Sequence, residues 1–118
     1  MALNEIDYSG PAQPIDGYGP GFFRFGGRVW QGPLLVGPAG AAAWGGMEDL
    51  AALKALEGQV DVLLLGTGAT LSYADPALMV VMNDLGIGVE PMISPSAARS
   101  YNMLLAEGRR VAAALLPV

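Results

Sequence analysis

The feature that most constrains the fold is an alternation of helical and strand patterns through the second half of the chain. Helical spacing of apolar residues covers residues 47–57, 75–85 and 94–107. Strand-like apolar segments stand between and after them at residues 60–65, 87–90 and 110–116. Strands and helices that alternate with short links predict parallel βαβ units, and therefore an α/β fold.

The expected helices are bounded by residues that favour helix ends. Asp75 and Ser94 are each followed by proline, which is the order of an N-cap and a first helical residue. Gly58, Gly86 and Gly108 stand where the three helices would stop. We therefore expect the Asp75 and Ser94 side chains to cap their helices.

The first half of the chain differs, since 11 of the 17 glycines lie in residues 1–46. Two runs, 22–25 and 28–31, flank Gly26-Gly27, and both glycines can adopt the positive φ that a type I′ turn requires. Such a hairpin puts Phe23 opposite Trp30. A strand at 34–36 and a small, flexible segment at 39–46 complete this half. We expect an antiparallel hairpin extension or second sheet within a single domain, 1–118.

Composition excludes several classes of chemistry. The chain has neither cysteine nor histidine, which removes disulfides, Ser-His and Cys-His catalysis and the usual zinc ligands, so we expect no metal and no cofactor. A net charge of −5 argues against nucleic acid and against anionic lipid. With 53% hydrophobic and only 14% charged residues, some apolar surface is left for a protein partner or a second copy.

The sequence also bears on where the protein acts. The first residues lack the basic start and apolar stretch of a signal peptide. No apolar run approaches the roughly 20 residues of a membrane-spanning helix. We therefore expect a cytoplasmic protein, not an integral membrane protein, whose contact with the inner membrane would go through a partner.

Gly66-Thr67-Gly68 follows a buried strand and is a candidate backbone cradle for a small anion. A dinucleotide fingerprint would need another small residue where Leu71 stands, and a P-loop would need Gly-Lys-Ser or Gly-Lys-Thr. The alternative is a tight strand exit in which any side chain would collide. Spacing alone leaves both interpretations open.

The end of the next strand carries a second group of polar candidates, Glu90, Ser94, Arg99 and Asn102. Ligands of open α/β sheets usually bind at this edge. A buried Glu90 would serve as a general base, which is the basis of an enzymatic hypothesis. The alternative is a structural ion pair between Glu90 and Arg99 beside a helix cap.

Two further pairs have a functional and a structural interpretation. Arg109 and Arg110 would hold an anion or a partner's carboxylate, or else cap helix carbonyls or lie in solvent. Trp44 and Tyr73 lie in predicted loops, where an aromatic side chain either anchors an interface or folds back over the core.

Several motifs together resemble one family of domains of uncharacterised function. They are Gly88–Met92, Ser94, the segment 97–102, the segment 105–115, Gly66-Thr67-Gly68, the Phe-rich hairpin and the early Ile6-Asp7-Tyr8. The family includes mitochondrial complex I assembly factor 3 and the adipogenesis-associated Mth-type domain protein. The resemblance covers nearly the whole chain, and this chain looks like a bacterial-type member.

The resemblance implies a compact three-layer α/β fold with no established enzyme activity and no cofactor. It favours a non-enzymatic interaction or assembly factor, with a respiratory or other membrane complex as the candidate target. The expected partner is a complex subunit or another assembly factor, and the protein itself is expected to be a monomer or weak homodimer. A small-anion-binding module at Gly66–Gly68 is the alternative.

Overall fold

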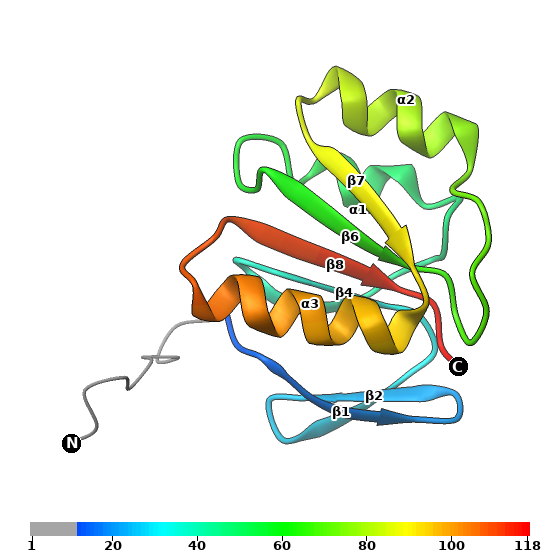
Figure 1. Cartoon of the computed structure of the whole chain (residues 1–118), viewed down its shortest axis with the longest axis vertical. Helices are drawn as coiled ribbons and strands as arrows, with labels where there is room; N and C mark the ends of the chain where they lie inside the picture. The colour runs from blue at the N-terminus through cyan, green and yellow to red at the C-terminus, as the bar shows by residue number, and fades with distance from the viewer. Residues whose placement is uncertain (1–11) are drawn as a thin grey trace.

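The computed structural model describes residues 12–118, in which three helices and eight strands form three layers (Figure 1). The helices are α1 (Leu50–Lys54), α2 (Pro76–Asp84) and α3 (Ser94–Ala106). The strands are β1 (Ile15–Gly19), β2 (Phe22–Phe25), β3 (Arg28–Gln31), β4 (Leu34–Gly37), β5 (Gly40–Ala43), β6 (Val62–Gly66), β7 (Gly88–Met92) and β8 (Val111–Leu115). The mixed α/β class and the layered arrangement are as predicted. Ile6-Asp7-Tyr8 and the N-terminal part of the 1–118 domain prediction lie outside the described residues.

The middle layer is a five-stranded sheet in the order β5-β4-β8-β6-β7. Strand β6 pairs in parallel with both β7 and β8, whereas β4 is antiparallel to β8 and to β5. The chain steps from β6 outward to β7 through α2 and then back past β6 to β8 through α3. Because parallel crossovers are right-handed, steps in opposite directions put α2 and α3 on opposite faces of the sheet.

The antiparallel extension is a separate three-stranded sheet in the order β1-β2-β3. Strands β2 and β3 form the predicted hairpin, with Phe23 opposite Trp30 and Phe25 opposite Arg28. Gly26 and Gly27 turn between them with φ of 62° and 75°, which agrees with a turn that favours glycine. Arg28 lies over the Trp30 ring, 4.5 Å from its centroid.

The side chains of the central strands divide between two cores. Leu64 and Ala113 face α3 and the three-stranded sheet, where Phe23 and Tyr101 are also fully buried. The residues on either side of them face α1 and α2 instead, and they are Leu63, Leu65, Ala112 and Ala114. This alternation is the period-two pattern of a strand that is covered on both faces. It confirms the predicted buried strands in the second half of the chain.

Two local predictions were wrong. The first helix was expected over residues 47–57 but covers only Leu50–Lys54. Asp49 caps it, since its carboxylate accepts hydrogen bonds from the N–H groups of Ala52 and Gly45. The segment predicted as flexible contains β5, because Gly37 and Gly40 allow a tight return that pairs β5 with β4.

Within residues 12–118, no helix has the length and hydrophobicity needed to cross a membrane. The longest of the described helices, α3, has 13 residues.

Candidate functional site

The predicted glycine site is a closed junction between the ends of β6 and β8 and the start of α3. Gly66, Thr67 and Gly68 are all buried, and so is Ser94 at the first turn of α3. A β-carbon on Gly66 would stand 2.6 Å from the Ser94 hydroxyl and 2.8 Å from Leu115 Cδ2. The structure therefore supports the tight strand exit, in which any side chain would collide.

The Ser94 hydroxyl joins three chain segments at this junction. It accepts a 2.9 Å hydrogen bond from the Gly68 N–H and donates one of 2.5 Å to the Leu116 carbonyl oxygen. The prediction that Ser94 caps its helix was wrong, because Ile93 is the N-cap and no side chain caps α3. The Ser94 side chain instead points into the junction and binds neighbouring backbone, which explains why it is fully buried.

Thr67 ties the loop that follows β6 to the sheet. Its N–H donates to the Met92 carbonyl oxygen at 2.8 Å, and its hydroxyl donates to the Thr70 carbonyl oxygen at 2.8 Å. The same hydroxyl accepts a 3.2 Å bond from the Ser72 N–H. An anion cradle needs backbone N–H groups that are free to donate. Those of Thr67 and Gly68 are already bonded, so the anion-binding alternative is not supported.

Glu90 and Arg99 do not form the predicted pair. Both side chains are exposed, and Arg99 donates to the Ser96 hydroxyl at 3.3 Å. The one ion pair within residues 12–118 joins Arg110 to Asp61 at 3.8 Å. Glu90 is therefore not the buried carboxylate on which the enzymatic hypothesis depends.

Asn102 has a structural contact in another part of α3. Its side chain accepts from the Ile15 N–H at 2.8 Å and donates to the Ile15 carbonyl oxygen at 2.9 Å, which fixes β1 to α3. Eight helical residues separate it from Ser94, a rise of about 12 Å. The structure thus brings Ser94 to Gly66 and Gly68 but places Asn102 elsewhere.

The two arginines after α3 also differ from each other. Arg110 donates to the carbonyl oxygens of Gly58 and Gln59 at 2.8 and 3.3 Å. These residues lie in the turn after α1, beyond the end of that helix at Lys54, so the bonds of Arg110 are not the predicted capping of helix carbonyls. Arg109 is exposed. Its predicted role in holding an anion or a partner's carboxylate stays a prediction.

The two loop aromatics have opposite environments. Trp44 is buried, and its indole N–H donates to the Asp49 carbonyl oxygen at 3.3 Å, so it closes the core over α1. Tyr73 is 97% exposed. Exposure of a whole aromatic side chain is unfavourable in a free surface and is typical of an interface anchor.

Tyr73 belongs to an apolar surface on the loop between β6 and α2. A hollow of about 360 Å³ there is lined by residues that we call the Tyr73 surface: Leu71, Ser72, Tyr73, Ala74 and Pro91. Leu71 is 68% exposed. Of the seven large hydrophobic residues exposed in the described chain, four fall in residues 71–80. The sequence singles out Tyr73 as a loop aromatic but gives no signal for its neighbours, because a loop has no periodicity that shows which apolar side chains stay exposed.

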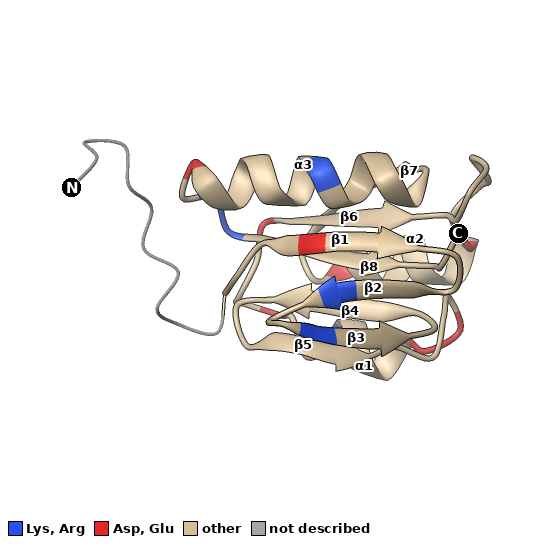
Figure 2. Cartoon of the chain, turned by 90° about the horizontal axis from the view of Figure 1, so that it is seen from below, with Lys and Arg blue, Asp and Glu red and all other residues tan. Residues whose placement is uncertain are grey.

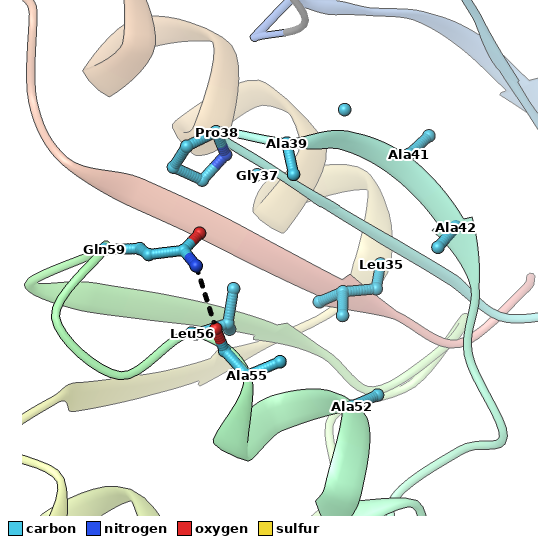
Figure 3. A pocket seen from close by; sticks show the side chains of 11 residues that line it. Leu35, Gly37, Pro38, Ala39, Ala41, Ala42, Ala52, Ala55, Leu56 and Gln59 are labelled. Carbon is cyan, nitrogen blue, oxygen red and sulfur yellow. Dashed lines mark hydrogen bonds between the residues drawn. The ribbon is translucent and has the colours of Figure 1, made fainter.

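A second apolar groove lies between the edge strand β5 and α1 (Figure 3). It has a volume of about 170 Å³, and small side chains such as Ala42, Ala52 and Ala55 line it together with Leu35. The Gln59 amide at its end donates to the Ala55 carbonyl oxygen at 3.0 Å. No charged residue lines this groove, and Gln59 is the one residue in its lining with a polar side chain. The groove therefore has few groups that would orient a small ligand.

The model of one protein family matches residues 15–116, which is most of the chain. The chain belongs to the DUF498/DUF598 family of proteins of unknown function. This family membership and the relatives below confirm the resemblance that the sequence motifs carried.

Two relatives place the chain within the family. An uncharacterized protein of Rhodobacter capsulatus is 55% identical over 118 residues, covering all of this chain and 94% of that protein. NADH dehydrogenase [ubiquinone] 1 alpha subcomplex assembly factor 3 of Danio rerio is 34% identical over 110 residues. That match covers 87% of this chain and 63% of the assembly factor, so the chain spans less than two thirds of that protein's length.

The fold of this family member is found in solved structures. The crystal structure described as an outer membrane protein from Bartonella henselae has a TM-score of 0.82 and 34% sequence identity. The similarity covers 93% of this chain and 98% of that one, so the two chains share the fold over most of their length.

Proposed function

We propose that this protein is a non-enzymatic interaction factor that acts in the assembly of a membrane protein complex. The similarity to a complex I assembly factor supports this function, since most of this chain takes part in the match. The Rhodobacter relative is itself uncharacterized and adds no activity. Two polar side chains at the strand ends, Thr67 and Ser94, support the proposal in another way, because their hydroxyls are occupied by structural hydrogen bonds.

The observation that carries the proposal is the Tyr73 surface. Its aromatic side chain is almost completely exposed and stands beside Leu71 over an apolar hollow. Apolar side chains grouped around an exposed aromatic residue are the usual centre of a protein–protein contact. A partner that covers Leu71 and Tyr73 would remove their apolar area from water, which favours association.

The hydrogen bonds of the loop support the same function. Thr67 holds the Thr70 carbonyl group and the Ser72 N–H on either side of Leu71. A loop that is fixed before binding loses less conformational entropy when a partner docks. The proposed partner is a subunit of a respiratory or other membrane complex, or another assembly factor. The protein itself is proposed to be cytoplasmic, held at the inner membrane by that partner, and a monomer or weak homodimer.

Site-specific photo-crosslinking in the protein's own cells tests this function. A photoreactive phenylalanine replaces Tyr73 in one strain and Met103 in a control strain. Met103 is a suitable control because it is 64% exposed but lies near the end of α3, nine residues beyond Ser94. We expect position 73 to form an adduct with one membrane-complex subunit or assembly factor, and position 103 to form none with that protein.

A second readout links the contact to assembly. Native gels of solubilised membranes would compare the amount of complete complex in the wild type, in a Tyr73→Ser strain and in a Met103→Ser strain. We expect the Tyr73→Ser strain alone to accumulate partly assembled complex. Equal adducts at both positions, together with complete assembly in the Tyr73→Ser strain, would refute the proposed function.

A further inference from the structure

The five-stranded sheet ends in two edge strands, β7 and β5, whose outer sides differ. In β7, the Gly88 N–H and the Met92 carbonyl oxygen bond on the β6 side, so the backbone of Pro91 faces outward. Proline has no N–H to donate, and the neighbouring Glu90 adds a charge to this edge. Proline and charged residues on an edge strand disfavour the addition of another strand.

The backbone of β5 is open on its outer side. The Trp44 N–H donates to the Pro33 carbonyl oxygen at 3.1 Å, which fixes the alternation of the ladder between β4 and β5. Ala42 therefore bonds toward β4, whereas the backbones of Ala41 and Ala43 face outward. Within residues 12–118, the N–H and carbonyl groups of Ala41 and Ala43 have no hydrogen-bond partner. The edge thus presents two donors and two acceptors at strand spacing.

The edges of the three-stranded sheet are less open. At β1, the backbone N–H and carbonyl groups of Ile15 are already bonded to the Asn102 side chain. The other edge strand, β3, begins with Arg28, whose charge disfavours strand addition. Figure 2 shows charged residues on β1, β2 and β3, whereas β5 carries none. Among the described strands, β5 is therefore the edge that neither a charge, a proline nor a side-chain contact protects.

The apolar groove lies beside this open edge (Figure 3). Ala42 pairs with Leu35, and both line the groove together with Ala52 and Ala55. Directly opposite residues of two paired strands point to the same face of the sheet. The residue opposite Ala42 on an added strand would therefore point to the face that carries the groove.

We propose that β5 binds an extended segment of a partner protein, which joins the five-stranded sheet as an additional antiparallel strand. Hydrogen bonds to the backbones of Ala41 and Ala43 would hold the segment, and an apolar side chain opposite Ala42 would fill the groove. This inference goes beyond the proposed function, because it concerns a second surface. The Tyr73 surface includes Pro91 of β7, at the opposite edge of the same sheet.

A second copy of the chain matches this edge less well. Residues 39–43 are alanine and glycine only, so pairing of β5 with itself would place nothing larger than a methyl group in the groove. The groove would stay unfilled, whereas protein contacts are normally close-packed. These small side chains also contribute little toward the roughly 1,000 Å² that a stable interface buries. A partner segment with a larger apolar side chain fits both the backbone and the groove.

Hydrogen exchange in the isotope-labelled full-length protein, with a designed peptide as the probe, tests the inference. The peptide alternates leucine and threonine and has a lysine at each end for solubility. In the free protein, the amides of Ala41 and Ala43 should exchange faster than that of Ala42, which bonds to β4. At about ten times the Kd of the peptide, about a tenth of the protein stays free, so exchange at Ala41 and Ala43 should slow about tenfold.

Two N-methylated peptides are the matched controls, because they keep every side chain. When leucine lies opposite Ala42 in an antiparallel strand, the threonine N–H groups point toward β5 and the leucine N–H groups point away. Methylation of the threonine nitrogens should therefore abolish the slower exchange, and methylation of the leucine nitrogens should preserve it. A peptide with alanine in place of leucine should bind about tenfold more weakly, since it leaves the groove unfilled.

Variants of the protein locate the contact. Ala43→Pro removes an outward N–H of β5. Gln31→Pro is the control on the edge of the other sheet, where Gln31 faces outward because the Gly32 N–H bonds to the Gly21 carbonyl oxygen. Edge strands tolerate proline where the N–H faces solvent, so both variants should fold, which circular dichroism would check. We expect only Ala43→Pro to lose the peptide. Should Ala43→Pro not fold, Ala42→Lys gives the same expected loss, because it places a charge beside the groove.

Several results would overturn the inference. One is equal binding of the two methylated peptides, since pairing at a strand edge distinguishes them. Another is slow exchange at Ala41 and Ala43 without peptide: protection that rises with protein concentration would identify a second copy as the occupant, and protection independent of concentration another segment of the same chain. A partner crosslinked at position 73 without peptide binding at β5 would remove this inference and leave the proposed function standing. Peptide binding without that crosslink would do the reverse.

Discussion

Two adjacent regions of the chain follow β6, and they differ in burial and in hydrogen bonding. Residues 66–68 are all buried, and their contacts are hydrogen bonds within the protein. Residues 69–73 are all exposed, and they end at an aromatic side chain that is 97% exposed. The first region joins the layers of the fold, and the second offers apolar surface to the solvent. A change in the first should therefore alter stability, and a change in the second should alter binding.

The largest effect on stability is expected from Gly66→Ala. The added methyl would stand 2.6 Å from the Ser94 hydroxyl and 3.0 Å from Ser94 Cα, and the second of these atoms is backbone that cannot rotate away. Overpacking of this kind costs about 3 kcal/mol. Urea unfolding followed by circular dichroism would measure the loss.

Gly88→Ala is the matched control for that experiment. Gly88 also lies in a parallel strand of the same sheet, but a β-carbon there would meet only the Asp61 carbonyl oxygen, at 3.8 Å. Replacement should be neutral or stabilise the protein by up to about 1 kcal/mol, because alanine lowers the entropy of the unfolded chain. Similar losses for the two variants would show that the junction is not closed as described.

Ser94→Ala should have the next largest effect. Removal of the hydroxyl leaves the Gly68 N–H and the Leu116 carbonyl oxygen without their partner in a buried site, which costs about 1–3 kcal/mol. Ser96→Ala is the control, because its hydroxyl bonds only to the exposed Arg99 and its loss should change stability by less than about 0.5 kcal/mol. An unchanged unfolding midpoint in Ser94→Ala would contradict the role of this hydroxyl as the joint between segments.

Thr67→Val connects the two regions and should have a smaller effect on stability, about 1 kcal/mol. Valine keeps the shape of the side chain but cannot bond the Thr70 carbonyl oxygen or the Ser72 N–H. We expect faster hydrogen exchange at residues 70–73 and less crosslinking of the partner at position 73, although Thr67 does not line the hollow. Thr70→Val removes an exposed hydroxyl and should change neither measurement; a loop that exchanges at the wild-type rate in Thr67→Val would show that it is fixed by other contacts.

The sequence predicted the fold well where the signal was local. The glycine pair of the hairpin, the Asp75-Pro76 helix start and the buried strands each depend on neighbouring residues, and each is present in the structure. Strand β5 was missed because Gly40 and three alanines have little strand propensity of their own. Its pairing with β4 depends on a tertiary contact that no short window of sequence contains.

The candidate site was predicted less well, for a physical reason. Gly66-Thr67-Gly68 has the composition of an anion cradle, but whether its N–H groups are free depends on Met92 and Ser94, which are more than 20 residues away. Serine is a residue type that favours a helix N-cap, but the Ser94 hydroxyl does not cap α3. It is bonded instead to the Gly68 N–H and the Leu116 carbonyl oxygen. Composition gives the groups that can bond, and only the fold decides which of them remain free.

The smallest effect on stability is expected at the Tyr73 surface. The variant that combines Leu71→Ser with Tyr73→Ser replaces two side chains that are largely exposed. Its unfolding free energy should therefore change by no more than about 0.5 kcal/mol per site. Assembly of the membrane complex should nevertheless fail, since both side chains line the hollow that the proposed partner covers. A large loss of stability would mean that the loop supports the core, and that the division into a buried region, residues 66–68, and an exposed region, residues 69–73, is wrong. Retained stability with lost binding would instead separate folding from recognition within eight residues of chain.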